Sequence, residues 1–190
     1  MTAADRERWE ARWQARAGGP GQPEPFLAQR LAELEPGRVL DVAAGAGANA
    51  LLLARRGFAV TALDIAPSAL ARLSAAAAAE GLEIARRAAD LDHPAALDGL
   101  EAFDDLVVIR YGPTPPQWQR LLGCLRPGGI LLLCSFGIAQ AERTGFSRTY
   151  CLVREEVAQA LGPAMACLAW HGFEQAGQAL EGSLWRKAGS

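Results

Sequence analysis

The chain has 190 residues, 51% of them hydrophobic and 21% charged, and this composition suits one globular domain with a sizeable core. Its net charge of −2 carries none of the basic excess that nucleic-acid binding needs. No stretch resembles a signal peptide or a membrane span, so we expect a cytoplasmic protein that binds neither nucleic acid nor membrane.

The predicted elements begin with an amphipathic helix over residues 4–17, a loop rich in glycine and proline over 18–25, and a short helix over 26–34. From residue 38 the pattern alternates between apolar strands and helices. The strands are expected at 38–42, 58–64, 82–88, 104–109 and 129–136, and the helices at 47–57, 67–81, 116–125 and 153–161. The last two segments, 165–176 and 182–188, are expected to form a closing antiparallel pair.

Alternating apolar strands and helices indicate a mostly parallel sheet covered on both faces. No internal repeat or linker divides the chain, so we expect a single domain over residues 1–190, with 1–35 as an N-terminal helical cap and 36–190 as the core. The four cysteines form no CxxC pair, which favours free thiols over disulfides or a zinc site, and no metal is expected.

A glycine-containing loop in the stretch "VLDVAAGAGANALLLARRG", residues 39–57, is a candidate ligand site. The first strand ends near Asp41, Gly45 and Gly47 leave the backbone open to a ligand, and a helix begins at about Asn49. Taken alone, the loop also fits the fingerprint of a nicotinamide cofactor site or a plain turn.

Aspartates are expected at the carboxyl ends of three successive strands, with Asp41 near the end of the first, Asp64 closing the second and Asp90 following the third. Asp41 suits a cationic ligand, Asp64 can accept hydrogen bonds from ribose hydroxyls, and Asp90 can accept from the exocyclic amine of adenine. This combination matches S-adenosylmethionine, a sulfonium with an amino-acid tail, better than a dinucleotide.

With these residues in place, the chain resembles a known family over residues 36–137, the class I S-adenosylmethionine-dependent methyltransferases. The 39–57 stretch resembles the first motif of that family, "VTALDIAPSAL" the second and "ADL" the third. "FDDLVVIRY" resembles the strand-four motif, and "LRPGGILLL" the entry to strand five. The resemblance implies an α/β doubly wound, Rossmann-like sheet of seven strands with an antiparallel closing strand and an N-terminal helical lid.

The resemblance also implies S-adenosyl-L-methionine as the cofactor and a set of residues that bind it. These are Asp41, Ala43, Gly45, Gly47, Asn49, Asp64, Ile65, Asp90, Leu91 and Arg110. Ala43 stands where the family has the first glycine of the loop, so its methyl group should narrow the pocket for the methionine end.

Within the family, the chain is most similar to small bacterial enzymes of the tellurite-resistance and thiopurine type. The likeness rests on "GAGANAL", on "WEARWQ" and on an imperfect "Pro-x-x-Phe-Leu" match at 23–27. It implies that Trp9 and Trp13 form part of a lid that folds over the cofactor and contacts the substrate, although the same tryptophans could simply dock the helix on the core.

Substrate contacts are expected from two segments. Tyr111, directly after the fourth strand, is the candidate catalytic residue that orients the nucleophile, while Arg110 should lie near the methionine tail and pair with its carboxylate or with Asp41. Arg148 and Tyr150 could close the pocket from the other side or pin their loop.

The sequence therefore predicts transfer of a methyl group to a small-molecule nucleophile, either a soft sulfur, selenium or tellurium atom or an oxygen or nitrogen acceptor. No evident general base selects among them. Two alternatives stay open, a catalytically inactive regulatory protein that binds S-adenosylmethionine and a nicotinamide-dependent oxidoreductase. The sequence does not fix the oligomeric state.

Overall fold

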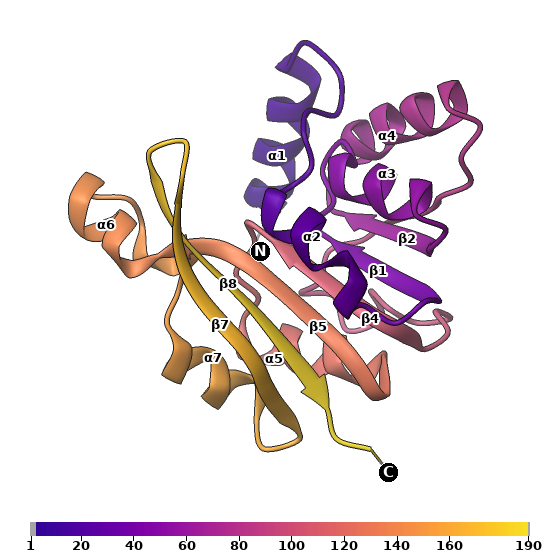
Figure 1. Cartoon of the computed structure of the whole chain (residues 1–190). Coiled ribbons are helices and arrows are strands. Elements are labelled where there is room, and N and C mark those ends of the chain that lie inside the picture. The colour runs from indigo at the N-terminus through magenta and orange to yellow at the C-terminus, as the bar shows by residue number, and fades with distance from the viewer. Residues whose placement is uncertain (1–2, 190) are drawn as a thin grey trace.

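The computed structural model describes residues 3–189, which build one mixed sheet with helices on both faces (Figure 1). The strands are β1 Arg38–Val42, β2 Ala59–Asp64, β3 Ala85–Ala88, β4 Phe103–Ile109, β5 Leu125–Gly137, β6 Cys151–Leu152, β7 Met165–Gln175 and β8 Gln178–Lys187. The helices are α1 Ala3–Ala15, α2 Pro25–Arg30, α3 Ala48–Arg55, α4 Pro67–Ala79, α5 Pro115–Gly123, α6 Ile138–Thr144 and α7 Arg154–Leu161, with short 3-10 turns at Leu31–Glu33 and Arg148–Tyr150.

The strand order is β3-β2-β1-β4-β5-β8-β7, and the short β6 pairs with the end of β5. Strands β1 to β5 run parallel, whereas β8 is antiparallel to both β5 and β7. The order reverses between β1 and β4, and open α/β sheets bind their ligands at such a switch point, at the carboxyl ends of the strands. The expected Rossmann-like class with its antiparallel strand is confirmed.

Each face of the sheet carries its own hydrophobic core. On one face α2, α3 and α4 pack through residues such as Leu27, Leu53 and Leu73, and on the other α5 and α7 pack through Trp118 and Leu161. Because the strand residues alternate between these two clusters, the central strands are apolar on both sides.

Three local differences from the expected elements have physical causes. Strand β5 begins at Leu125 and not at residue 129, because Leu125 pairs with Phe103 across an irregularity in the register. The chain between β5 and α7 forms α6, a 3-10 turn and β6, which no strong sequence pattern marked. Hairpin β7–β8 closes on Ala176 and Gly177, both with positive φ, so β8 starts at 178 and not at 182.

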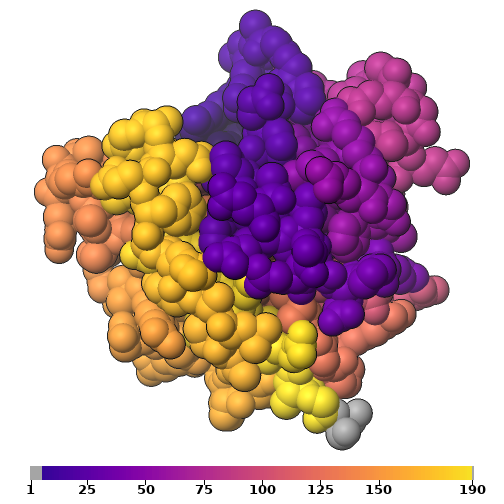
Figure 2. Space-filling model, in the orientation of Figure 1, coloured from indigo at the N-terminus to yellow at the C-terminus, as the bar shows by residue number. Residues whose placement is uncertain are grey.

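The N-terminal segment lies against the rest of the molecule. Helix α1 docks on the start of α4, where the backbone N–H of Ser68 donates to Glu10 Oε2 at 3.2 Å. Phe26 of α2 stacks on Phe173 of β7, with ring centroids 5.7 Å apart. Figure 2 shows the indigo N-terminal residues lying between the yellow β8 region and the magenta α4. This placement brings α1 and the loop after it over the carboxyl edge of the sheet.

Candidate functional site

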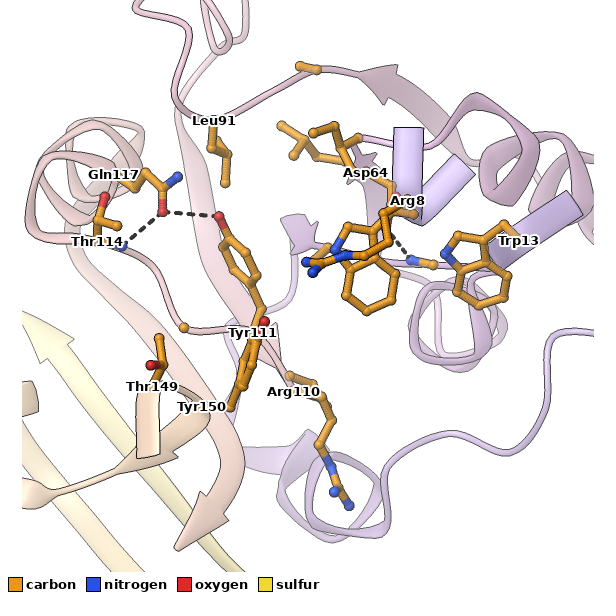
Figure 3. Close-up of a pocket in the computed structure, with 18 residues that line it drawn as sticks. Arg8, Trp13, Asp64, Leu91, Arg110, Tyr111, Thr114, Gln117, Thr149 and Tyr150 are labelled. Carbon is orange, nitrogen blue, oxygen red and sulfur yellow. Dashed lines mark hydrogen bonds between the residues drawn. The ribbon is translucent and has the colours of Figure 1, made fainter. Parts of the chain in front are cut away.

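The main cavity, of about 360 Å³, lies at the carboxyl ends of β1, β2 and β4 under helix α1 (Figure 3). Ten of the residues expected from the sequence line it: Trp9, Trp13, Ala43, Gly45, Asp64, Ile65, Leu91, Arg110, Tyr111 and Tyr150. The sequence reasoning missed Arg8, Leu63, Ala89, Ile109, Gly112, Thr114, Gln117 and Thr149, which also line it.

We call the wall formed by Ala43, Gly45, Asp64 and Ile65 the loop half of the cavity. Here the carboxylate of Asp64 is held by backbone N–H groups, from Gly45 at 2.8 Å to Oδ2 and from Ala66 at 2.9 Å to Oδ1. Each carboxylate oxygen has a second lone pair, so both can accept a further hydrogen bond from a ligand. Burial raises the pKa of Asp64 above its ordinary value, against the lowering effect of those N–H donors.

The loop bends through three residues in the left-handed region, Ala43 at φ 56°, Gly45 at φ 56° and Gly47 at φ 85°. A Cβ at Gly45 would lie 2.7 Å from Trp13 Cζ2, and a Cβ at Gly47 would overlap Leu73. Both glycines are therefore required by conformation and by packing. Ala43 adopts the same conformation as a non-glycine residue, at a cost of about 1–3 kcal/mol.

Asp41 lies behind the loop and not in the cavity wall. It is 1% exposed, and its Oδ2 has no hydrogen-bond partner among residues 3–189. Burial, followed by repulsion from Asp64, raises its pKa to about 8. An orphaned buried carboxylate beside an open glycine loop fits a cationic ligand bound above it.

We call the opposite wall, formed by Tyr111, Gln117, Thr149 and Tyr150, the tyrosine half. Tyr111 donates its hydroxyl hydrogen to Gln117 Oε1 at 3.0 Å, and Figure 3 shows this side chain reaching across to Gln117. Burial raises the pKa of Tyr111 to about 12, so its hydroxyl stays protonated at neutral pH.

Gln117 is fixed from two further sides. Its Oε1 accepts from the backbone N–H of Thr114 at 2.8 Å, and its Nε2 donates to Asp92 Oδ1 at 2.7 Å. The capping box at the start of α5 makes the first of these bonds. The spacing of Thr114 and Gln117 is a sequence signal for the start of α5, but only the fold places Gln117 in the site.

Arg110 leaves the sheet at φ 56° and points away from Tyr111 (Figure 3). The expected pairing with Asp41 is wrong for this structure, because the guanidinium binds Glu24 Oε2 at 3.2 Å and Gln178 Oε1 at 3.0 Å. It also lies 4.5 Å above the ring of Phe136. Arg110 thus ties the N-terminal segment to the end of β4 and to β8.

A second cavity, of about 440 Å³, lies on the other side of the glycine loop. Gly47 and Asn49 line this cavity and not the main one, and Asn49 Oδ1 accepts from the backbone N–H of Glu24 at 2.8 Å. Asp90 lines a third cavity, of about 400 Å³, next to Ile65 and His93, and accepts from the backbone N–H of Asp92.

Arg148 is an expected substrate-binding residue that lines none of these three cavities. Its side chain is 61% exposed and pairs with Glu156 at 2.5 Å, within its own region of the chain and outside the main cavity. Its neighbour Tyr150 remains at the cavity, where its backbone oxygen accepts from Ser135 Oγ at 2.8 Å.

In the part of the chain that the structure describes, no group of three or more histidine, cysteine or acidic side chains could hold a metal ion. The four cysteines are free thiols. Across residues 3–189, every helix is too short or too polar to cross a membrane.

Comparison with known proteins relates the chain to methyltransferases. Residues 39–129 match the sequence profile of a methyltransferase domain, whereas no curated protein sequence matches the chain significantly. A structure solved for work on the conversion of a disulfide bond into a thioacetal group during echinomycin biosynthesis is similar, with a TM-score of 0.79 and 21% identity over 96% of this chain and 91% of that one.

Two bacterial structures are also similar. TehB from Haemophilus influenzae has a TM-score of 0.70 and 18% identity over 86% of this chain and 62% of that one. The N-methyltransferase NodS from Bradyrhizobium japonicum WM9 has a TM-score of 0.67 and 20% identity, with 99% of both chains covered. At these identities the likeness to each structure is a likeness of fold.

Proposed function

We propose that this chain, which is a class I S-adenosylmethionine-dependent methyltransferase, transfers the methyl group of S-adenosylmethionine to a small-molecule nucleophile in the main cavity. The observation that carries the proposal is Asp64, a buried carboxylate oriented by two backbone N–H groups at the carboxyl end of β2, one strand from the switch point of the sheet. When bound, S-adenosylmethionine supplies an activated methyl group on a sulfonium.

In the proposed arrangement the loop half holds the cofactor. Asp64 accepts from the two ribose hydroxyls, Ile65 and Leu91 enclose the adenine ring, and Asp90 accepts from its exocyclic amine. Ala43, Gly45 and Gly47 let the cofactor approach the backbone. A positively charged sulfonium bound above the loop would lower the raised pKa of Asp41 and so favour its ionised form.

The tyrosine half holds the acceptor in the same proposal. Tyr111 orients the nucleophile through its hydroxyl and shields it from water with its ring, while Tyr150 closes the opposite side. Trp9 and Trp13 roof the cavity from α1, so residues 1–35 act as a cap on a single domain. Arg148 is left out of this proposed contact set because its guanidinium pairs with Glu156.

The acceptor class follows from what the cavity offers for proton transfer. Among its described lining residues, Asp64 is the only carboxylate, and histidine and lysine are absent. Tyr111, with a pKa of about 12, is a poor base at neutral pH. We therefore favour a soft acceptor such as a sulfur atom, which needs no base, and the similar structure from work on thioacetal formation supports this choice.

The test has two stages. Calorimetry should show binding of S-adenosylhomocysteine and no binding of NAD or NADP; the reverse result would point to an oxidoreductase. Isotope-labelled S-adenosylmethionine is then offered with thiophenol, phenol and aniline as matched acceptors. We expect label to enter thiophenol fastest, whereas cofactor binding without turnover on any acceptor would indicate a regulatory protein.

A further inference from the structure

Glu24 is a buried carboxylate that the proposed function leaves without a role. Its side chain is 6% exposed, and Oε2 accepts from Arg110. Oε1 is also buried, yet it has no hydrogen-bond partner among the residues that the structure describes. Burying a carboxylate oxygen without a hydrogen-bond donor costs free energy. A ligand that brought a positively charged group or an N–H donor to Glu24 Oε1 would remove that cost.

Glu24 lines the second cavity, which adjoins the main one. The two cavities share a wall made of Trp13, Ala43, Gly45, Ile109 and Arg110. A ligand that passes over the glycine loop therefore reaches from the adenosine side into the second cavity. Trp13, which packs against Gly45, lies at this passage.

The charges in the second cavity suit a zwitterion. Glu24 and Arg110 together carry no net charge, but Glu24 has an oxygen free to accept and Arg110 is 28% exposed. The first turn of α3, at Ala48 and Asn49, adds backbone N–H groups that have no partner within the helix, together with the positive end of the helix dipole. An α-amino acid group, with one ammonium and one carboxylate, complements both members of the pair.

We propose that Glu24 binds the α-ammonium group of the cofactor's methionine end, with its carboxylate beside Arg110 and the start of α3. The inference rests on the proposed function and adds to it a residue outside the five motifs of residues 36–137. Asn49 positions Glu24 for this contact, because its Oδ1 fixes the backbone N–H of Glu24 at 2.8 Å.

The competing explanation is structural, with Glu24 serving only to hold the N-terminal segment on Arg110. The affinities of three ligands that differ only at the amino-acid end can distinguish the two explanations. S-adenosylhomocysteine carries the α-amino acid group, its deaminated analogue lacks only the amino group, and 5′-methylthioadenosine lacks the whole end. All three keep the adenosine part that Asp64 is proposed to hold.

The experiment is calorimetry of these three ligands with wild type, Glu24→Gln and a control. Glu33→Gln is the matched control, since Glu33 lies on the same segment but is exposed and pairs with Arg30. We expect Glu24→Gln to weaken S-adenosylhomocysteine by roughly 10- to 100-fold, as for loss of a charged hydrogen bond. Its affinity for the deaminated analogue and for 5′-methylthioadenosine should stay within about twofold of wild type.

Two outcomes would overturn the inference. One is unchanged S-adenosylhomocysteine affinity in Glu24→Gln, and the other is an equal loss for all three ligands, which a displaced segment would produce. If Glu24→Gln does not fold, wild type alone decides, because equal affinity for S-adenosylhomocysteine and its deaminated analogue would contradict an ammonium site. Absence of binding by all three ligands to wild type would instead overturn the proposed function.

Discussion

The two halves of the main cavity are built by different means. In the loop half, backbone makes the wall: Asp64 is held by the N–H groups of Gly45 and Ala66, and the loop bends through left-handed residues. In the tyrosine half, side chains hold one another, as Tyr111 does with Gln117 and Gln117 with Asp92. A wall made of backbone allows few residue types at each position, whereas a network of side chains can be built from many. This difference suits a site in which the loop half binds one cofactor and the tyrosine half can be adapted to different methyl acceptors.

The largest expected effect tests the constraint on the loop half. Gly47→Ala introduces a side chain at φ 85° that overlaps Leu73, so we expect a loss of about 2–6 kcal/mol of folding free energy. Gly57→Ala is the matched control, since Gly57 has φ 86° but no atom within 4 Å of the added Cβ. It should lose about 1–2 kcal/mol from backbone strain alone. Denaturant titration that gave equal losses would show that packing against Leu73 does not constrain the loop.

The second prediction concerns pH, because two buried carboxylates titrate near neutral pH, Asp41 behind the loop half and Asp105 near the start of β4. Tyr111, with a pKa of about 12, stays protonated over the same range. Burial raises the pKa of Asp41 to about 8 and that of Asp105 to about 7, so the folded chain holds protons that the unfolded chain releases near pH 4. Stability therefore falls as pH rises from about 4 to 8.

An amide does not titrate, so Asp105→Asn should remove the contribution of Asp105 to this pH dependence. That contribution is a fall of up to about 4 kcal/mol in the free energy of unfolding between pH 4 and 7. Asp105 lies at the start of β4, away from the cavity, so S-adenosylhomocysteine affinity should not change. Denaturation series at several pH values check this, and a variant with an unchanged slope would mean that Asp105 is ionised in the folded chain.

The third prediction addresses the cofactor contact itself. Asp64→Ala removes the proposed ribose acceptor and should weaken S-adenosylhomocysteine by about 1.5–3 kcal/mol, or roughly 10- to 150-fold. Asp64→Asn should lose less, since one acceptor oxygen remains. Calorimetry on both variants, with unfolding curves to confirm folding, measures the difference. Wild-type affinity in Asp64→Ala would place the ribose elsewhere.

The smallest expected effect belongs to the tyrosine half. Tyr111→Phe removes one hydroxyl and should lower turnover of the best thiol acceptor about tenfold, equivalent to one hydrogen bond. S-adenosylhomocysteine affinity should stay within about twofold, because Tyr111 is proposed to face the acceptor. A variant that lost cofactor affinity and kept its turnover would reverse the roles given to the two halves.

The same division explains what the sequence could predict. Strands with clear apolar patterns end at or next to Asp41 and Asp64, and Gly45 and Gly47 follow the first of them, so the place of all four at the carboxyl edge could be derived from spacing. Gln117 could not, because it lies on α5 and enters the cavity only through the fold.

The pairing of Glu24 with Arg110 could not be predicted for a related reason. The two residues lie 86 positions apart in the chain, and no periodic pattern links a loop to a strand end at that distance. The turn at Ala176 and Gly177 was missed because alanine rarely adopts a positive φ, so the usual hairpin signal was absent.

The most direct test of the central claim is a crystal structure of the chain with S-adenosylhomocysteine. The account predicts ribose hydroxyls on the carboxylate of Asp64, adenine between Ile65 and Leu91, and the thioether sulfur between the glycine loop and Tyr111. The amino-acid end should lie next to Glu24 in the second cavity. An adenosyl group bound away from Asp64, or bound outside the main cavity, would contradict the account.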